Sequence, residues 1–336
     1  MTSQKWNPGT LLETSGYFWK TCTLHAGVKL DVFTFIGEDK LAAEDIAARV
    51  GADVDAMTRL LDALTAMELT EKENGMYANT GAAAKYLSKN SPDYVGYMIM
   101  HHHYLVDYWR RLDESVKTGN PVREPESEDD KTWNNDAERE AFLMGMFNIA
   151  SLTAPQLVAE VDLEGKRRLL DLGGGPGTYA IHFCRQYPEL TATIFDLPTT
   201  RPFAEKTVDR FGMTDRIGFK DGNYLDQELP GGYDVVWMSH ILHGEGYDAC
   251  REIIRKAWRT MEEGGMIIIH DFILDDTRTQ PLFPALFSLN MLVGTKDGRA
   301  YTESEIEDML KDAGFNDIKR LSFTGPTQSG LMTALK

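Results

Sequence analysis

A run of apolar residues that ends in an acid and four closely spaced glycines constrains the fold of this chain most strongly. The stretch LLDLGGGPGTYAI, at residues 169–181, has the pattern of a buried strand, a tight turn and the start of a helix. A turn of this kind forms a nucleotide-binding corner in a parallel sheet, where ligands lie beyond the carboxyl ends of the strands.

Strands and helices alternate from residue 167 to the end of the chain. Seven candidate strands lie at 168–172, 191–196, 216–221, 234–239, 265–272, 318–323 and 331–336. Helical stretches are expected between the first six strands, whereas only TGPTQSG joins the last two, which predicts an antiparallel hairpin. This order predicts an α/β fold with a Rossmann-like, seven-stranded sheet.

The first ninety residues have a predominantly helical pattern. Apolar side chains recur at helical spacing between Ile46 and Leu64, Gly51 interrupts the run, and Asp53 is a candidate cap for the next helix. A hairpin is expected to turn at Asn74–Gly75. Helices followed by a hairpin predict a winged-helix unit, interpreted here as a dimerisation domain at residues 1–92.

Charge argues against nucleic acid as a partner of this unit. Residues 1–100 hold nine Lys and Arg against thirteen Asp and Glu, and the net charge of the chain is −17. A strongly acidic chain repels phosphate backbones. We expect neither a nucleic-acid nor a membrane partner. The three widely spaced cysteines and the absence of a leader-like N-terminus predict a cytoplasmic location.

A second helical region, at residues 93–160, is rich in Met, aromatic residues and His. It includes His101, His102 and His103, but consecutive helical residues point about 100° apart, so the three cannot share one face. No metal site is predicted there. The polar, acidic stretch at 118–136 is expected to be a loop, and the cofactor-binding domain is expected at residues 161–336.

The spacing of the glycine loop disfavours a dinucleotide. A G-x-G-x-x-G fingerprint would place its third glycine where this chain has Thr178, and here the glycine comes one residue earlier, at Gly177. Pro176 removes a backbone donor that a pyrophosphate would use. The loop therefore favours S-adenosylmethionine (SAM), which has no phosphate, over NAD.

Acidic and polar residues follow the first three strands in an order that suits SAM. Asp171 precedes the glycines, where it can meet a cationic amino or sulfonium group. Asp196 ends the second strand, where a carboxylate can accept hydrogen bonds from both ribose hydroxyls. Asp221, Asn223 and Tyr224 end the third strand, where an adenine ring would lie. The alternative for Asp171 and Asp196 is helix capping.

From about residue 12 to its end, the chain resembles the SAM-dependent O-methyltransferases of the acetylserotonin and plant caffeate type. The motifs that carry this resemblance are LLDLGGGPGTYA, IFDLP, DGNYL, YDVVWMSHILHG, GGMIIIHDFILDD and YTESEIEDMLKDAGF, with LDVF, LAAEDIAARV and GMYANT nearer the N-terminus. The resemblance implies a winged-helix dimerisation domain, a class I methyltransferase domain and a homodimer. It also implies SAM as methyl donor and S-adenosylhomocysteine as product.

Catalytic roles carry over to two residues of this chain. His243 matches the general base that takes the proton from the acceptor hydroxyl, and Asp271 matches a carboxylate that supports this histidine. A phenol, with a pKa of about 10, is a poor nucleophile until its proton leaves, and a neutral imidazole can take that proton. The family's second carboxylate matches Ala300, so that partner is missing, and Glu245 is a candidate substitute.

Binding residues are expected in two groups. The cofactor group comprises Asp171, Gly173, Gly175, Asp196, Leu197, Asp221, Gly222, Asn223, Tyr224 and Ser239. The substrate group comprises His103, Met146, Asn290 and Met291. The two methionines match residues that clamp aromatic substrates in the family, and methionine packs adaptably against rings. An apolar, Met-rich lining predicts a flat aromatic or polycyclic acceptor.

Methyl transfer from SAM to a hydroxyl of such a molecule is therefore the leading prediction. Two alternatives stay open. One is methyl transfer to a ring carbon of a quinone-like or tetrapyrrole-like molecule. The other is a SAM-binding regulator that uses the winged helix on DNA.

Overall fold

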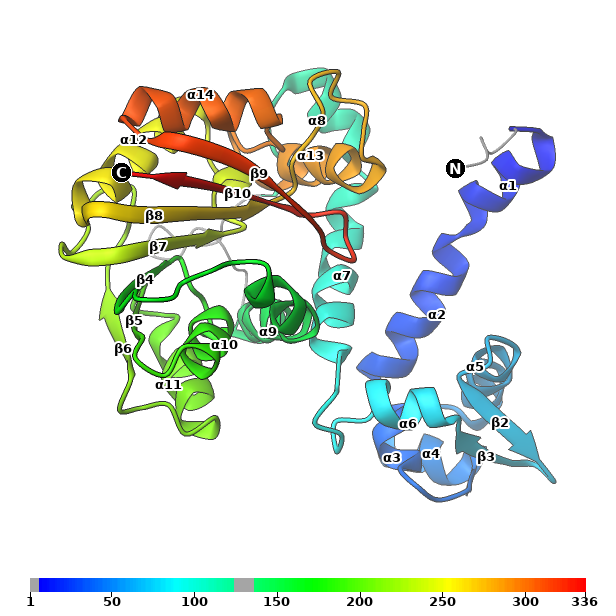
Figure 1. The fold of residues 1–336 in the computed structure, drawn as a ribbon. Helices are drawn as coiled ribbons and strands as arrows, with labels where there is room; N and C mark the ends of the chain where they lie inside the picture. The colour runs from blue at the N-terminus through cyan, green and yellow to red at the C-terminus, as the bar shows by residue number, and fades with distance from the viewer. Residues whose placement is uncertain (1–5, 124–135) are drawn as a thin grey trace. The chain divides into compact units, whose positions relative to one another are not determined.

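The structure is a computed structural model that describes residues 6–123 and 136–336, and the chain divides into two compact units (Figure 1). Unit 1 comprises the chain up to Tyr104 together with Glu140–Asn148, and unit 2 comprises Leu105–Arg139 and Ile149–Lys336. Helices α7 (Gly96–Trp109) and α9 (Asp136–Ala159) contribute residues to both units. The acidic stretch expected to be a loop lies mostly outside the described residues, and the three predicted domain ranges stay a prediction.

Unit 1 is mainly helical. Besides parts of α7 and α9 it contains α1 (Pro8–Gly16), α2 (Phe18–Lys29), α3 (Val32–Ile36), α4 (Ala43–Val50), α5 (Val54–Ala66) and α6 (Gly81–Leu87). Its strands β1 (Leu41–Ala42), β2 (Thr70–Glu73) and β3 (Met76–Asn79) pair antiparallel in the order β1-β3-β2. A core that includes Phe33, Ile46 and Leu61 packs these elements together.

The local sequence signals of unit 1 are confirmed. Helix α4 ends at Gly51, whose φ of 68° is left-handed, and Asp53 caps α5 by accepting the Ala56 N–H at 2.9 Å. The β2–β3 hairpin turns at Asn74 and Gly75, which both have positive φ, as a type I′ turn requires. Helices α4 and α5 followed by this hairpin agree with the winged-helix interpretation, which stays a prediction.

Unit 2 is built around one seven-stranded sheet. Its strands are β4 (Arg168–Leu172), β5 (Thr191–Asp196), β6 (Ile217–Asp221), β7 (Tyr233–Ser239), β8 (Met261–Asp271), β9 (Asn316–Thr324) and β10 (Gly330–Leu335). Its helices are α8 (Leu112–Thr118), α10 (Thr178–Gln186), α11 (Arg201–Arg210), the 3₁₀ turn η1 (Leu242–Gly244), α12 (Tyr247–Thr260), α13 (Leu282–Gly294) and α14 (Glu303–Ala313). The strand order is β6-β5-β4-β7-β8-β10-β9, and β10 runs antiparallel to both of its neighbours.

The predicted fold class is confirmed, with seven strands and a reversed final hairpin. Strand β8 begins at Met261, earlier than expected, and its pairing with β7 shifts register between Tyr233 and Val235. The expectation of a helix between every pair of the first six strands is wrong at residues 222–232, where turns and loop join β6 to β7. Pro230, Gly231 and Gly232 lie in this segment and disfavour a helix.

The sheet of unit 2 separates two hydrophobic cores, because strand side chains alternate between its faces. On one face, Val236 packs in a cluster with residues of α12 and α14; on the other, Trp237 packs in a cluster with residues of α10 and α11. Figure 1 shows these helix pairs on opposite sides of the sheet. Helices therefore cover both faces of the sheet. Polar residues that bind a ligand are expected at the ends of its strands.

Among the described residues, one helix passes a simple test for crossing a membrane. Helix α9 is long and apolar enough by length and composition, but 56% of its most apolar window is buried inside the structure. A core helix of a globular protein has these same properties. The predicted cytoplasmic location and the predicted absence of a membrane partner stay predictions.

Gly177, the residue before α10, brings that helix close to β5. Its φ is 77°, and a Cβ at this position would lie 2.4 Å from Cδ1 of Ile194. Gly165 has almost the same backbone, with a φ of 78°, but a Cβ there would meet nothing within 4 Å. Comparing alanine substitutions at the two glycines therefore distinguishes the cost of left-handed backbone strain from the cost of overpacking.

We expect Gly177→Ala to lower the free energy of unfolding by about 3 kcal/mol, because left-handed strain and overpacking add. Gly165→Ala, which introduces only the strain, is expected to cost about 1 kcal/mol. Chemical denaturation followed by circular dichroism measures both losses. Equal losses in the two variants would show that contact between helix and strand does not set the need for glycine.

Candidate active site

Backbone hydrogen bonds tie together the loops at the carboxyl ends of β4, β5 and β6. The N–H of Gly173 donates to the carbonyl of Phe195 at 2.8 Å, and the N–H of Gly222 donates to the carbonyl of Asp196 at 2.9 Å. The N–H of Gly175 donates to Oδ2 of Asp196 at 2.8 Å. The structure therefore brings the predicted cofactor residues of three strands to one edge of the sheet.

Two glycines of the loop after β4 differ in their surroundings. A Cβ on Gly173 would lie 2.2 Å from Cδ1 of Ile241 and 3.6 Å from a ring carbon of Tyr224, so this backbone is closely packed. Gly175, with a φ of 53°, would meet nothing within 4 Å. Open space over a left-handed glycine is where a ligand can approach the backbone.

Asp171 is a buried carboxylate with spare hydrogen-bonding capacity. Its side chain is buried at the end of β4, and within the described chain its Oδ2 has no hydrogen-bond partner. Burial raises the pKa of Asp171 to about 7, although the N–H of Ala180 donates to it and favours the charged form. A buried acid with an unpaired oxygen suits a cationic ligand group.

Asp196 organises two loops. Besides the Gly175 N–H, it accepts the N–H of Leu197 at 2.7 Å and the hydroxyl of Thr200 at 3.2 Å. The Leu197 side chain itself is 40% exposed. Sequence reasoning did not anticipate this loop-organising role. The predicted contact of Asp196 with ribose hydroxyls stays a prediction.

The residues at the end of β6 are held by side-chain contacts. Arg201 Nε donates to Oδ1 of Asp221 at 3.0 Å, and its Nη2 lies 2.8 Å from Oδ2. Asn223 Oδ1 accepts the N–H of Leu225 at 2.9 Å. The hydroxyl of Tyr224 donates to Oε1 of Glu245 at 3.2 Å. The turn expected beside adenine is therefore an ordered structure.

The ammonium group of Lys256 holds this turn in place. Lys256 of α12 is only 6% exposed, and its Nζ donates to the carbonyls of Tyr224 and Leu225 at 2.9 and 2.8 Å. A buried charge needs such partners. Sequence reasoning missed Lys256, because a lysine within an amphipathic helix gives no signal of what it contacts.

The two predicted catalytic residues meet at the ends of neighbouring strands. His243 lies on η1 after β7, and Asp271 ends β8. The distance from His243 Nδ1 to Asp271 Oδ1 is 2.6 Å. The carboxylate accepts a hydrogen bond from Nδ1–H, which leaves Nε2 of the neutral ring as an acceptor.

Asp271 is ionised although it is buried. Burial alone would raise the pKa of Asp271, but the adjacent His243 and His240 hold it well below its ordinary value. The N–H of Phe272 also donates to Oδ1 of Asp271, at 2.7 Å. Asp271 can therefore orient His243 and stabilise the imidazolium that forms when the ring takes a proton.

The second carboxylate of the family has no direct replacement among the described residues. Ala300 is buried at the matching position, and Asp271 is the carboxylate that hydrogen-bonds to His243. Glu245, the candidate substitute, is bonded instead to Tyr224, and burial raises its pKa.

Aromatic rings surround His243. The ring of Phe287 lies 4.7 Å from the imidazole centroid in an edge-to-face arrangement, and that of Phe272 lies 5.7 Å away, nearly parallel. Phe283 stacks on Phe287 at 6.1 Å. None of these three phenylalanines was among the predicted substrate residues. Phe283 and Phe287 are four residues apart on α13, so they share a helix face. This spacing could have indicated an aromatic cluster.

Ser239 is part of a buried hydrogen-bond chain. Its Oγ lies 2.9 Å from Nδ1 of His270, whose Nε2 lies 2.9 Å from Oγ of Ser329. Burial holds the pKa of His270 well below its ordinary value, so this ring is neutral. The predicted cofactor contact of Ser239 is not tested by these bonds.

The four predicted substrate residues fall in different units. Asn290 and Met291 lie on α13 in unit 2, and Oδ1 of Asn290 accepts the indole N–H of Trp109 at 2.8 Å. His103 and Met146 lie in unit 1, where Nε2 of His103 is 3.0 Å from Nζ of Lys29. Their predicted role in substrate binding stays a prediction.

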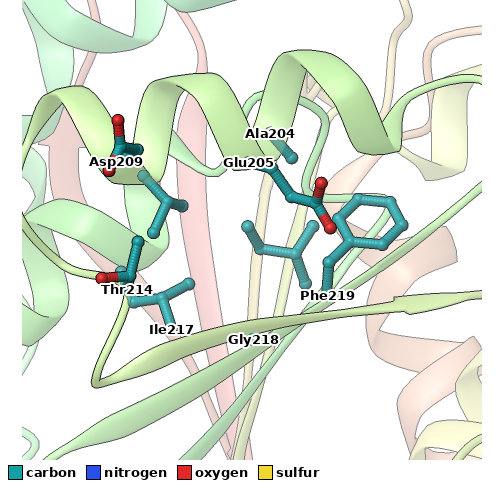
Figure 2. Close-up of a pocket in the computed structure, with 9 residues that line it drawn as sticks. Ala204, Glu205, Asp209, Thr214, Ile217, Gly218 and Phe219 are labelled. Carbon is teal, nitrogen blue, oxygen red and sulfur yellow. The ribbon is translucent and has the colours of Figure 1, made fainter.

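A hollow of about 370 Å³ lies elsewhere in unit 2, between α11 and β6 (Figure 2). Its lining is mostly apolar, with the carboxylates of Glu205 and Asp209 on the helix. None of the residues predicted to bind cofactor or substrate lines it. This hollow is therefore separate from the strand-end site.

Comparison with protein families finds two matches along the chain. The family model of the O-methyltransferase domain matches residues 126–316, and that of the O-methyltransferase dimerisation domain matches residues 12–89. Together they include both predicted catalytic residues and most of unit 1.

Individual proteins align over nearly the whole chain. The 3-hydroxy-5-methyl-1-naphthoate 3-O-methyltransferase of Streptomyces sahachiroi is 36% identical, over 98% of this chain and 95% of its own length. The tetracenomycin polyketide synthesis 8-O-methyl transferase of Streptomyces glaucescens is 31% identical, over 95% and 94%. The structure of human N-acetylserotonin methyltransferase in complex with SAM is similar, with a TM-score of 0.87, 26% identity and 100% and 99% coverage.

We expect the affinity of the protein for SAM to fall as the pH drops below 7. Below that pH the carboxyl of Asp171, with its pKa of about 7, gains a proton and loses its attraction for a cationic amino group. The affinity should fall by up to about tenfold per pH unit. Calorimetric titration with SAM from about pH 6 to about pH 8 measures it.

Asp171→Asn provides the control for this measurement, since the amide does not titrate. This variant should bind SAM more weakly and with the same affinity across the range. A wild-type affinity that is independent of pH would contradict the expected contact between Asp171 and the cofactor.

Proposed function

The chain belongs to the family of SAM-dependent O-methyltransferases, and from this premise we propose that it methylates a hydroxyl of an aromatic small molecule with His243 as general base. The observation that carries the proposal is the 2.6 Å hydrogen bond between His243 Nδ1 and Asp271 Oδ1. This bond supports the proposal, because a proton on Nδ1 leaves the lone pair of Nε2 free on the side of the ring away from the carboxylate. Neither a carbon methyltransferase nor a DNA-binding regulator is supported.

The protein has to supply a base but not an electrophile, because SAM already carries an activated methyl group. The Nε2 atom of His243 takes the proton from the acceptor hydroxyl, and the oxygen attacks the methyl carbon as the bond from carbon to sulfur breaks. S-adenosylhomocysteine leaves, and the ionised Asp271 stabilises the imidazolium until it loses its proton. General-base catalysis of this kind contributes about 10²- to 10⁴-fold in rate.

An aromatic acceptor suits the surroundings of His243. The rings of Phe272 and Phe287 lie beside the imidazole, and Phe283 packs against both of them; these rings offer faces and edges on which a flat ring can stack. The two Streptomyces relatives are named as methyltransferases of a hydroxynaphthoate and of tetracenomycin polyketide synthesis. A phenolic hydroxyl on a fused aromatic ring system is therefore the proposed acceptor.

The proposed SAM site is the edge where β4, β5 and β6 end. Asp171 there would bind the cationic amino group, and Asp196 would accept hydrogen bonds from the ribose. The open space over Gly175 would let the cofactor approach the backbone. Asp221, Gly222, Asn223 and Tyr224 form the turn proposed to lie beside adenine. Gly173, Leu197 and Ser239 complete the proposed set.

A homodimer formed through unit 1 is supported by exposed apolar side chains. Trp6 and residues on or between α1 and α2 are between 47% and 75% exposed: Trp6, Leu11, Leu12, Tyr17, Phe18 and Trp19. A group of large exposed apolar side chains supports an interaction site, and the dimerisation family model covers all but Trp6 and Leu11. A second copy of this chain is the proposed occupant.

We expect His243→Asn to lower kcat by about 10²- to 10⁴-fold while leaving the SAM dissociation constant unchanged, because asparagine cannot act as the base. Methyl-labelled SAM and a panel of hydroxynaphthoates measure transfer. The same substitution at His182, on α10, is the matched control.

An acceptor with a more acidic hydroxyl should reduce the defect of His243→Asn, since it ionises without the base. Full activity of His243→Asn, or label found on a ring carbon of the product, would contradict the proposed mechanism.

We expect Trp19→Asp to shift the protein from dimer to monomer, since a central aromatic contact is worth at least about 2 kcal/mol. Val116→Asp, at a residue of α8 that is 63% exposed, is the matched control and should stay dimeric. Analytical ultracentrifugation over a concentration series measures the change. An unchanged dimer in Trp19→Asp would place the interface elsewhere.

A further inference from the structure

His240 adopts a backbone conformation that non-glycine residues rarely take. Its φ is 59°, and its N–H donates to the carbonyl of His270 at 2.8 Å. The imidazole lies between the rings of His270 and Phe272, with centroids 4.5 Å from each. Conformations of this kind cluster at functional sites, and none of the proposed catalytic steps uses His240.

The nitrogen Nδ1 of His240 points toward Asp271 without bonding to it. It is buried, has no hydrogen-bond partner in the part of the chain that the structure describes, and lies 3.8 Å from Asp271 Oδ1. That distance is too long for a direct hydrogen bond. Nδ1 is therefore a buried polar atom that still lacks a partner.

Three potential metal ligands meet at this point. One ligand atom each of His240, His243 and Asp271 lies within 4.8 Å of the other two. The two imidazoles are 18% and 12% exposed and the carboxylate 4%, so the cluster is enclosed but has an opening. Two histidines and one carboxylate form a donor set that Zn²⁺ takes in proteins, with a fourth position left for water.

We propose that His240, His243 and Asp271 bind one transition-metal ion such as Zn²⁺, and that the bound ion inhibits methyl transfer. At bond lengths of about 2.1 Å, tetrahedral ligand atoms lie about 3.4 Å apart. The 3.8 Å separation between His240 Nδ1 and Asp271 Oδ1 would close slightly. The 2.6 Å separation between His243 Nδ1 and the same oxygen would open.

Inhibition follows from the tautomer of His243 and rests on its proposed role as the base. The ion binds the lone pair of Nδ1, so the single proton of the neutral ring moves from Nδ1 to Nε2. Nε2 is then a donor and has no lone pair for the acceptor hydroxyl. Asp271 is bound to the ion as well, so the positions of the base and of its supporting carboxylate are both occupied.

The binding test needs no methyl acceptor, and it uses protein that carries no polyhistidine tag. Calorimetry measures Zn²⁺ binding, and the visible spectrum of Co²⁺ reports its coordination. We expect one ion per chain in wild type, with the intense bands of tetrahedral Co²⁺. His240→Asn should weaken binding by about 10- to 100-fold, and asparagine tolerates the left-handed backbone. His182→Asn is the matched control and should bind as wild type does.

The activity test follows with the same proteins. Zn²⁺ should inhibit wild type and His182→Asn, a chelator should restore both, and the remaining activity of His240→Asn should resist Zn²⁺. If His240→Asn does not fold, His240→Gly is used in its place, because glycine adopts the left-handed backbone without strain and offers no ligand atom.

Wild type that binds no ion, or that binds as tightly after substitution of His240, overturns the proposal. Binding without inhibition overturns its inhibitory part. An inactive protein that still binds Co²⁺ through His240 would instead contradict the proposed function alone, so the two failures are distinguishable.

Discussion

The short hydrogen bond between His243 and Asp271 depends on the register of two neighbouring parallel strands. Ser239 pairs with His270, so β7 and β8 end side by side. Asp271 follows at once, and His243 comes one short turn after β7. A carboxylate buried at this point is tolerable because imidazoles lie beside it and the N–H of Phe272 donates to it. The register of the two strands therefore brings Asp271 beside His243. The ionised carboxylate in turn fixes the tautomer of the base.

Sequence reasoning located most of the fold, because its signals were local. The strand LLDLG, the left-handed glycines and the hairpin at Asn74–Gly75 each follow from a few adjacent residues. Polar residues directly after strands could be placed at one sheet edge for the same reason: parallel strands end together. The family resemblance then added His243 and Asp271, which spacing alone did not distinguish from other buried polar groups.

Contacts between distant segments could not be predicted in this way. Tyr224 reaches Glu245, and Lys256 reaches the loop after β6, across separations at which a sequence does not specify a partner. The absence of a helix at 222–232 is a different case, because a proline and two glycines at 230–232 signal it locally. The continuous patterns of α7 and α9 also hide the boundary between the two units, because a helix has the same periodicity on both sides of it.

The buried ammonium of Lys256 bears on the entropy of cofactor binding. Because it already holds the carbonyls of Tyr224 and Leu225, the proposed adenine-side loop has its shape before a ligand arrives. A loop ordered only on binding would lose conformational freedom at that step, at the expense of affinity. This chain meets that cost when it folds, so the cofactor encounters a preorganised surface.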